Sequence, residues 1–217
     1  MKRICAVALL TILLAGMLAV LAACGASTPT AEDLFEAGND LTTQANEALI
    51  AGQEQEAAQL YLQAEQAYKD GLAQEADTQT KIDLYVNLGV VHYQLGRLDD
   101  AIASYQAALK LAPNDADVHS NLGAAYVQKA LEATQNQRGQ DVITGFWEQA
   151  RGAYQTAVDL NPTLAQAHFG LGVIHMQLGE KEAAIAAFEA FQAHDTGDDP
   201  WATQEAARHL EDLKTAP

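Results

Sequence analysis

The residues that could do chemistry in this chain are a few histidines and one short acidic segment. His168 and His175 lie seven residues apart, so on a helix they would share one face as a pair of metal ligands. The segment 195–199 (DTGDD) has carboxylates that suit calcium, but it lacks the ligand spacing of an EF-hand loop. No cysteine or repeated carboxylate completes a ligand set near the histidines. We therefore expect the histidines to pack in place of aromatic residues, and we predict no metal site and no cofactor.

The motifs of the common enzyme classes are missing from the sequence. It contains no nucleophile elbow, no H-E-x-x-H zinc motif, no Walker loop and no G-x-G-x-x-G segment. The chain is also acidic, with 29 aspartates and glutamates against 12 lysines and arginines and a formal charge of −17. Such a surface repels phosphate backbones and anionic lipid headgroups. We predict that the chain is not an enzyme and has no nucleic-acid partner.

One more reactive side chain, Cys24, ends the apolar run at the N-terminus. The run follows Lys2 and Arg3, and this order of positive charge and then apolar residues is typical of an export signal. The only other cysteine, Cys5, lies inside the run and would be lost with it. The mature chain would then have no internal disulfide, and Cys24 would be its one thiol.

The end of the run, Leu21-Ala22-Ala23-Cys24, resembles the lipobox of bacterial lipoproteins. The resemblance implies that a signal peptide over 1–23 is removed and that Cys24 is lipidated, followed by a short tether over 24–32. The chain would be exported and held by its lipid on the extracytoplasmic side of a bacterial membrane, with inner or outer membrane left open. An uncleaved signal anchor is the alternative, because the run approaches the length of a membrane span.

The elements that would position any binding site are helices. Hydrophobic residues make up 49% of the chain and aromatic residues only 6%, and this alanine-rich apolar content suits closely packed helices. A repeat is visible within them. Asn87-Leu88-Gly89 recurs 34 residues later as Asn121-Leu122-Gly123, and Leu-Gly recurs a further 49 residues on, at 171–172. Residues Ala101, Tyr105, Ala108 and Pro113 recur 49 residues later as Ala150, Tyr154, Ala157 and Pro162.

This pattern of an aromatic residue, Leu-Gly, Ala, Tyr or Phe, Ala and Pro resembles the tetratricopeptide repeat. The resemblance implies an all-α fold, a right-handed α-solenoid of antiparallel helix pairs with a C-terminal capping helix. The folded domain would span 33–217. It would comprise a degenerate repeat at about 38–81, repeats at 82–115, 116–164 and 165–198, and the capping helix at about 200–215.

Packing within each unit follows from the repeat. We expect Gly89 and its equivalents to let the paired helix approach, with Ala101 and its equivalents on the facing side, while Tyr105 and its equivalents fill the space between units. In the degenerate repeat, Tyr61 lies 44 residues before Tyr105, which predicts about ten extra residues in its second helix. The fourth repeat departs from the pattern at Phe191 and Thr196.

The third repeat contains a 15-residue insertion, at 130–144, which we expect to lengthen both helices into a protruding knuckle. Its role is open between a tolerated surface loop and a binding face. Trp147 follows the insertion, and we interpret it as a filler between helices in preference to an interface anchor.

In tetratricopeptide proteins the first helices line a groove that binds peptides. The resemblance implies that the groove here is lined by Val86, Asn87, Val90, Tyr93, Gln94, Ser120, Asn121, Ala124, Val127, Gln128, Phe169, Val173, Met176 and Gln177. Val86, Val90 and Phe169 stand where a carboxylate clamp needs cations, so we predict an apolar groove without such a clamp. Asn87 and Asn121 resemble the asparagine ladder of some family members, or are simply common in that slot.

The predicted function is a membrane-anchored protein–protein interaction module, an adaptor or scaffold at the bacterial cell envelope. It would bind a segment of an envelope protein in the groove and reach the membrane through its N-terminal lipid. The alternative is a structural subunit of a fixed envelope assembly, of the secretin, pilus or protease-adaptor type, without a separable peptide ligand. The sequence leaves the partner's identity and a homo-oligomer open.

Overall fold

The computed structural model describes residues 28–215, which form nine α-helices and no β-strand. The helices are α2 (Ala31–Ile50), α3 (Glu54–Leu72), α4 (Thr78–Gln94), α5 (Leu98–Leu111), α6 (Ala116–Gln135), α7 (Gln140–Leu160), α8 (Ala165–Gln177), α9 (Lys181–His194) and α10 (Pro200–Thr215). Within this range no helix is both long and apolar enough to cross a membrane. Cys24 and the proposed signal peptide lie outside the described residues.

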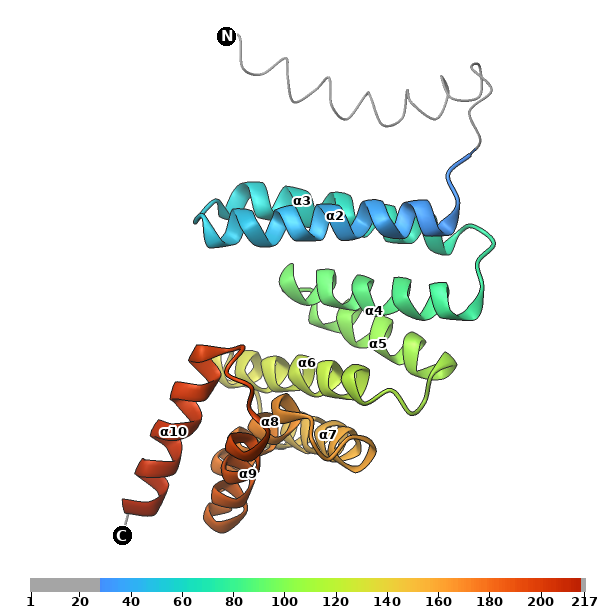
Figure 1. The fold of residues 1–217 in the computed structure, drawn as a ribbon. Helices are drawn as coiled ribbons and strands as arrows, with labels where there is room; N and C mark the ends of the chain where they lie inside the picture. The colour runs from blue at the N-terminus through green and yellow to red at the C-terminus, as the bar shows by residue number, and fades with distance from the viewer. Residues whose placement is uncertain (1–27, 216–217) are drawn as a thin grey trace.

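Eight of the helices form four stacked pairs, α2–α3, α4–α5, α6–α7 and α8–α9, and α10 packs on α9 (Figure 1). The first helices of successive pairs also contact one another: α2 touches α4, α4 touches α6, and α6 touches α8. First helices in mutual contact lie on the inner side of a curved stack, with the second helices outside. The predicted fold class, an all-α solenoid of helix pairs, is confirmed.

The helix boundaries follow from local sequence. The side chains of Asp77 and Asp115 cap α4 and α6 by accepting hydrogen bonds from backbone N–H groups of the first turn. After α4 the turn needs a left-handed residue, and Gly96 supplies it at a φ of +71°. In the turn between α6 and α7 the left-handed residue is Gln137, at a φ of 52°, so the inserted turn differs from the others.

The recurring spacing of glycine and aromatic residue creates the close contact inside each pair. A methyl group on Gly89 would lie 2.5 Å from Cε1 of Tyr105, on the paired helix. The same contact recurs between Gly123 and Tyr154 and between Gly172 and Phe188. The glycines therefore face aromatic rings and not alanines, which corrects one of our expectations. The other, that the rings fill the space between units, is confirmed for Tyr154, because a methyl group on Gly170 in α8 of the next pair would lie 2.4 Å from its Cζ. The ring is the group that needs the space, because a Cβ there would collide with it.

The first pair uses the same contact, in a register that corrects the sequence alignment. Gly38 in α2 faces the ring of Tyr68 in α3, as Gly89 faces Tyr105. Tyr68, and not Tyr61, is thus the equivalent of Tyr105. The two tyrosines are seven residues apart on one helix face, so periodicity alone could not separate them. The extra length is also shared by α2 and α3, which have 20 and 19 residues.

The insertion lengthens the third pair. Residues 130–135 extend α6 and residues 140–144 begin α7, with a turn over 136–139 between them. Both helices therefore project beyond their neighbours in the stack. Trp147 is buried, at 5% exposed, which confirms that it fills the space between helices.

Candidate functional site

The inner face contains a large cavity near the C-terminal end of the stack. It has a volume of about 770 Å³ and lies between α4, α6, α8 and the connection from α9 to α10. Most of its lining is apolar and comes from Tyr93, Ala124, Val127, Leu131, Phe169, Val173, Phe191 and Trp201. We call this cavity the groove. A cavity of this size, with apolar walls and a few polar groups, is typical of a binding site.

The structure brings together some of the fourteen residues that the sequence placed in a groove. Five line the cavity: Tyr93, Ala124, Val127, Phe169 and Val173. Gln94 and Gln128 instead border a smaller neighbouring hollow of about 390 Å³. The half-buried side chains of Val86 and Val90 pack on the core beside α5, and Met176 packs on the core beneath α10. Gln177 is exposed at the end of α8.

Ser120 is a correction to the predicted lining. Its side chain is 0% exposed and its hydroxyl has no hydrogen-bond partner within the described residues. Val86, at the equivalent position one repeat earlier, remains half-buried. The shorter serine side chain does not reach the surface, because neighbouring helices cover it.

The asparagine ladder stays a prediction. Asn87 donates a hydrogen bond from Nδ2 to the carbonyl oxygen of Asp83, at 2.9 Å, one turn earlier in its own helix. That bond uses one of the two amide hydrogens and leaves the rest of the amide for other partners. Asn121 is half-buried on α6.

An aromatic cluster forms the wall of the groove next to α10. Phe169 lies at its centre, with ring centroids 5.4 Å from Phe191 and 5.9 Å from Trp201, both in edge-on contact. Trp201 is 64% exposed, although it is the largest side chain of the wall. An exposed tryptophan beside a cavity leaves a large amphipathic surface for a ligand.

Three carboxylates border the same end of the groove: those of Asp195, Asp198 and Asp199. Asp199 accepts hydrogen bonds from the backbone N–H groups of Trp201 and Ala202, both at 3.1 Å, and so caps α10. Hydrogen bonds from Thr203 and from the N–H of Gly197 lower the pKa of Asp195. This end of the groove is therefore negatively charged.

Sequence reasoning missed this end of the site. It placed no residue of α10 or of the α9–α10 connection in the groove, because the repeat pattern stops before them. A signal was present in the two departures of the fourth repeat, since both Phe191 and Thr196 line the groove. Residues that break a repeat mark the place where the regular packing of the stack ends, and here that place borders the groove.

A second cluster of polar residues is buried between α3, α4 and α5. Glu65, His92 and Ser104 form a hydrogen-bonded chain, with 3.3 Å from Glu65 to Nε2 of His92 and 3.2 Å from Nδ1 to Ser104. The order acid, imidazole and hydroxyl is that of a serine hydrolase. The Ser104 hydroxyl, however, also donates to the carbonyl oxygen of Asp100, at 2.9 Å. Its hydrogen therefore points away from His92, and we assign the cluster a structural role.

The two histidines that suggested a metal pair have separate partners. Nε2 of His168 lies 2.8 Å from the carbonyl oxygen of Pro162, and its ring stacks on that of His194. Nδ1 of His175 lies 2.5 Å from a carboxylate oxygen of Glu180. In the part of the chain that the structure describes, no group of three His, Cys, Asp or Glu side chains is arranged to hold a metal ion.

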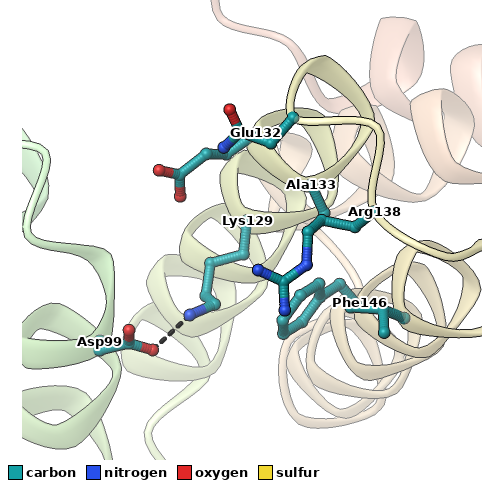
Figure 2. A pocket seen from close by; sticks show the side chains of 8 residues that line it. Asp99, Lys129, Glu132, Ala133, Arg138 and Phe146 are labelled. Carbon is teal, nitrogen blue, oxygen red and sulfur yellow. Dashed lines mark hydrogen bonds and ion pairs between the residues drawn. The ribbon is translucent and has the colours of Figure 1, made fainter.

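The knuckle has a small pocket of its own, of about 310 Å³ (Figure 2). Lys129 pairs there with Asp99 and lies 5.1 Å from the ring centroid of Phe146. Glu132, Asn136 and Arg138 complete the polar lining. With two cations beside two carboxylates, the pocket carries no net charge and differs from the groove in size and polarity.

Two stretches of the chain match models of the repeat suggested by the sequence. Residues 89–129 match a TPR repeat model, and residues 144–199 match a tetratricopeptide repeat model. The gap between the matches falls on the insertion. Together with the stacked pairs, the matches define a tetratricopeptide-type α-solenoid. No curated protein matches the chain in sequence.

Solved structures show the same fold at low sequence identity. A thermophilic tetratricopeptide protein from Thermus thermophilus is 22% identical, covers 82% of this chain and 81% of its own, and gives a TM-score of 0.60. PcrH, solved with the chaperone-binding region of PopD, is 22% identical over 63% of this chain and 92% of its own, with a TM-score of 0.52. The first tetratricopeptide domain of Spaghetti, bound to an HSP90 peptide, is 20% identical over 64% of this chain and 100% of its own, with a TM-score of 0.51.

Proposed function

We propose that this chain is a protein–protein interaction module that binds a segment of a partner protein in the groove. The observation that carries the proposal is the apolar cavity of about 770 Å³ on the inner face, with Trp201 exposed at its edge. Two of the similar structures, PcrH and the Spaghetti domain, were solved with bound protein segments or peptides. The apolar walls favour a segment with aliphatic or aromatic side chains.

We also propose that the module works at a bacterial envelope, anchored by lipid on Cys24. The lipobox-like sequence supports this, and about eight tether residues would reach about 25 Å when extended. The groove would then stay near the membrane and meet partners there. Membrane fractionation and mass spectrometry of the mature N-terminus test the anchor. A lipid-bearing Cys24 in the membrane fraction, with release of a Cys24→Ser variant, is the expected result, and an intact 1–23 segment would contradict it.

A structural subunit of a fixed envelope assembly is the second candidate. It is favoured by Ile50, which is 89% exposed at the tip of the first pair next to Leu49, at 41%. Apolar side chains at such a tip would be buried in a permanent contact. This contact would be independent of the groove.

One experiment separates the two functions. Lipidated chain is purified under mild conditions from native membranes as wild type, as Val127→Glu/Val173→Glu, as Trp201→Ala and as Ile50→Asp, with circular dichroism to confirm folding. Groove binding predicts a defined stoichiometric partner that is lost from both groove variants and kept by Ile50→Asp. A partner that is kept by both groove variants and lost from Ile50→Asp would contradict groove binding and support the fixed subunit.

A further inference from the structure

The charge at one end of the groove has a single sign. Asp195, Asp198 and Asp199 line that end, and none of the described residues that line the groove is a lysine or arginine. Asp198 accepts one hydrogen bond, from Thr196 at 2.5 Å. A carboxylate has room for several more hydrogen bonds, and two-pronged donors such as guanidinium suit it best. The groove therefore presents acceptors to a ligand and no opposing charge.

The exposed ring next to these acids suits the same kind of ligand. The backbone N–H of Trp201 donates to the Asp199 carboxylate at 3.1 Å, so ring and carboxylate lie within one turn of chain. The indole packs on Phe169 and is still 64% exposed. Tryptophan is the aromatic side chain that attracts cations most strongly. An ammonium or guanidinium at this end would meet a π face and several carboxylates together.

The residues that make this end of the groove are those that break the repeat. Phe191 replaces a small residue and widens the aromatic wall around Phe169, and Thr196 stands where a proline would end the helix. The Thr196 hydroxyl donates to Asp198 and orients it. Both departures therefore shape the aromatic and acidic end, and Phe191, at 3% exposed, also belongs to the core on which α10 packs.

Resting on the proposed function, we infer that the groove selects a partner segment with a lysine or arginine beside its apolar residues. The basic side chain binds between Trp201 and Asp198, and the apolar residues lie along Phe169 and Val173. A C-terminal carboxylate is disfavoured, because it would meet three like charges. A second copy of this chain is also disfavoured, because its formal charge of −17 leaves few cations to offer.

The inference is tested with peptides of known sequence. The full chain, in detergent, is used to select binders from a library of random dodecapeptides displayed on phage. One enriched peptide is then synthesised in three forms: as selected, with its basic residue replaced by leucine, and with its composition scrambled. Affinities are measured by fluorescence anisotropy for the wild type, Asp198→Asn, Val127→Glu/Val173→Glu and the control Glu211→Gln, which removes a charge from α10 outside the groove.

We expect the selected peptides to be enriched in lysine or arginine next to apolar residues. The leucine form should bind the wild type at least tenfold more weakly than the selected peptide, since a charged hydrogen-bonded contact is lost. Asp198→Asn should weaken the selected peptide several-fold and leave the leucine form unchanged, whereas Glu211→Gln should change neither. The scrambled peptide should bind weakly, which separates a site from general attraction to an acidic protein.

Two outcomes would overturn the inference in distinguishable ways. In the first, selected peptides bind the wild type and do not bind Val127→Glu/Val173→Glu, but they are not enriched in lysine or arginine and Asp198→Asn does not change their affinity. The inference then fails and the proposed function stands. If no peptide binds, or binding survives the two glutamate substitutions, the proposed function fails and the inference with it.

Discussion

Glu65 shows how one buried carboxylate joins three helices. It lies in α3 and accepts hydrogen bonds from Lys69 at 2.6 Å, from His92 in α4, and from Arg97 at the start of α5. Burial raises the pKa of Glu65, but the bonds from Arg97, Lys69 and His92 outweigh it and hold the pKa at about 2. The fold therefore stabilises the ionised form of the Glu65 carboxyl group relative to its protonated form.

This pKa predicts acid-sensitive stability. Because the folded pKa lies below the ordinary value of 4.5, the stabilisation is present above about pH 4.5 and is lost as the pH falls toward 2. We expect Glu65→Gln to lower the free energy of unfolding by about 2–3 kcal/mol at pH 7 and by much less near pH 2. Urea unfolding of both chains between pH 7 and pH 2 measures the difference, and a difference that is constant with pH would contradict this account.

The contact between Gly89 and Tyr105 predicts opposite effects at two glycines. Gly89→Ala should destabilise the chain by about 1–3 kcal/mol, since a Cβ would overlap the ring. Gly152→Ala, in an open position on α7, should stabilise it by up to about 1 kcal/mol through helix propensity alone. Thermal unfolding gives the sign of the change in stability for each variant. Equal changes for Gly89→Ala and Gly152→Ala would refute the packing argument.

At the scale of elements, the insertion has converted a turn glycine into a helix residue. Gly145 lies 49 residues after Gly96, the left-handed glycine of the turn after α4. In this chain Gly145 lies inside α7 with open space where a Cβ would lie, and the turn has moved to 136–139. The third pair is therefore a standard repeat with its turn displaced outward by the inserted residues.

Removing residues 130–144 should restore that repeat. We expect the deleted chain to stay folded and helical, with Gly145 following Lys129 as the new turn residue. The effect of Gly145→Ala on stability should then have opposite signs in the two chains. It should stabilise the full chain by about 0.5–1 kcal/mol. It should destabilise the chain without residues 130–144 by about 1 kcal/mol or more, because alanine disfavours a positive φ. Unfolding curves of the four chains measure this, and a stabilising effect in both backgrounds would show that the turn has not returned.

Repetition explains how much could be predicted from the sequence. The fold followed from the spacing of glycines and aromatic residues, because every pair must solve the same packing problem. The register of the first pair did not follow, since Tyr61 and Tyr68 share one face and only contact with Gly38 distinguishes them. The end of the groove formed by α10 and the α9–α10 connection was equally hidden, because α10 is not a repeat and its position depends on tertiary packing.

At the scale of the whole molecule, the solenoid presents an apolar groove on an otherwise acidic surface. The lining of the groove runs from the aromatic and acidic wall around Trp201 to residues of α4 and α6. The described chain begins beside α2, far along the stack from α10 (Figure 1). A lipid on Cys24 would thus hold the first pair at the membrane and leave the groove accessible.

Contact between the groove and a partner segment is the central claim, and site-specific photo-crosslinking tests it most directly. A photoreactive phenylalanine analogue is placed at Val127 or Trp201 in the groove, or at Ala103, which is exposed on α5 outside it. After irradiation in native membranes, mass spectrometry identifies the crosslinked peptide. We predict one partner segment, the same from both groove positions and not obtained from Ala103. Crosslinks from Ala103 to a partner that neither groove position reaches would contradict the claim.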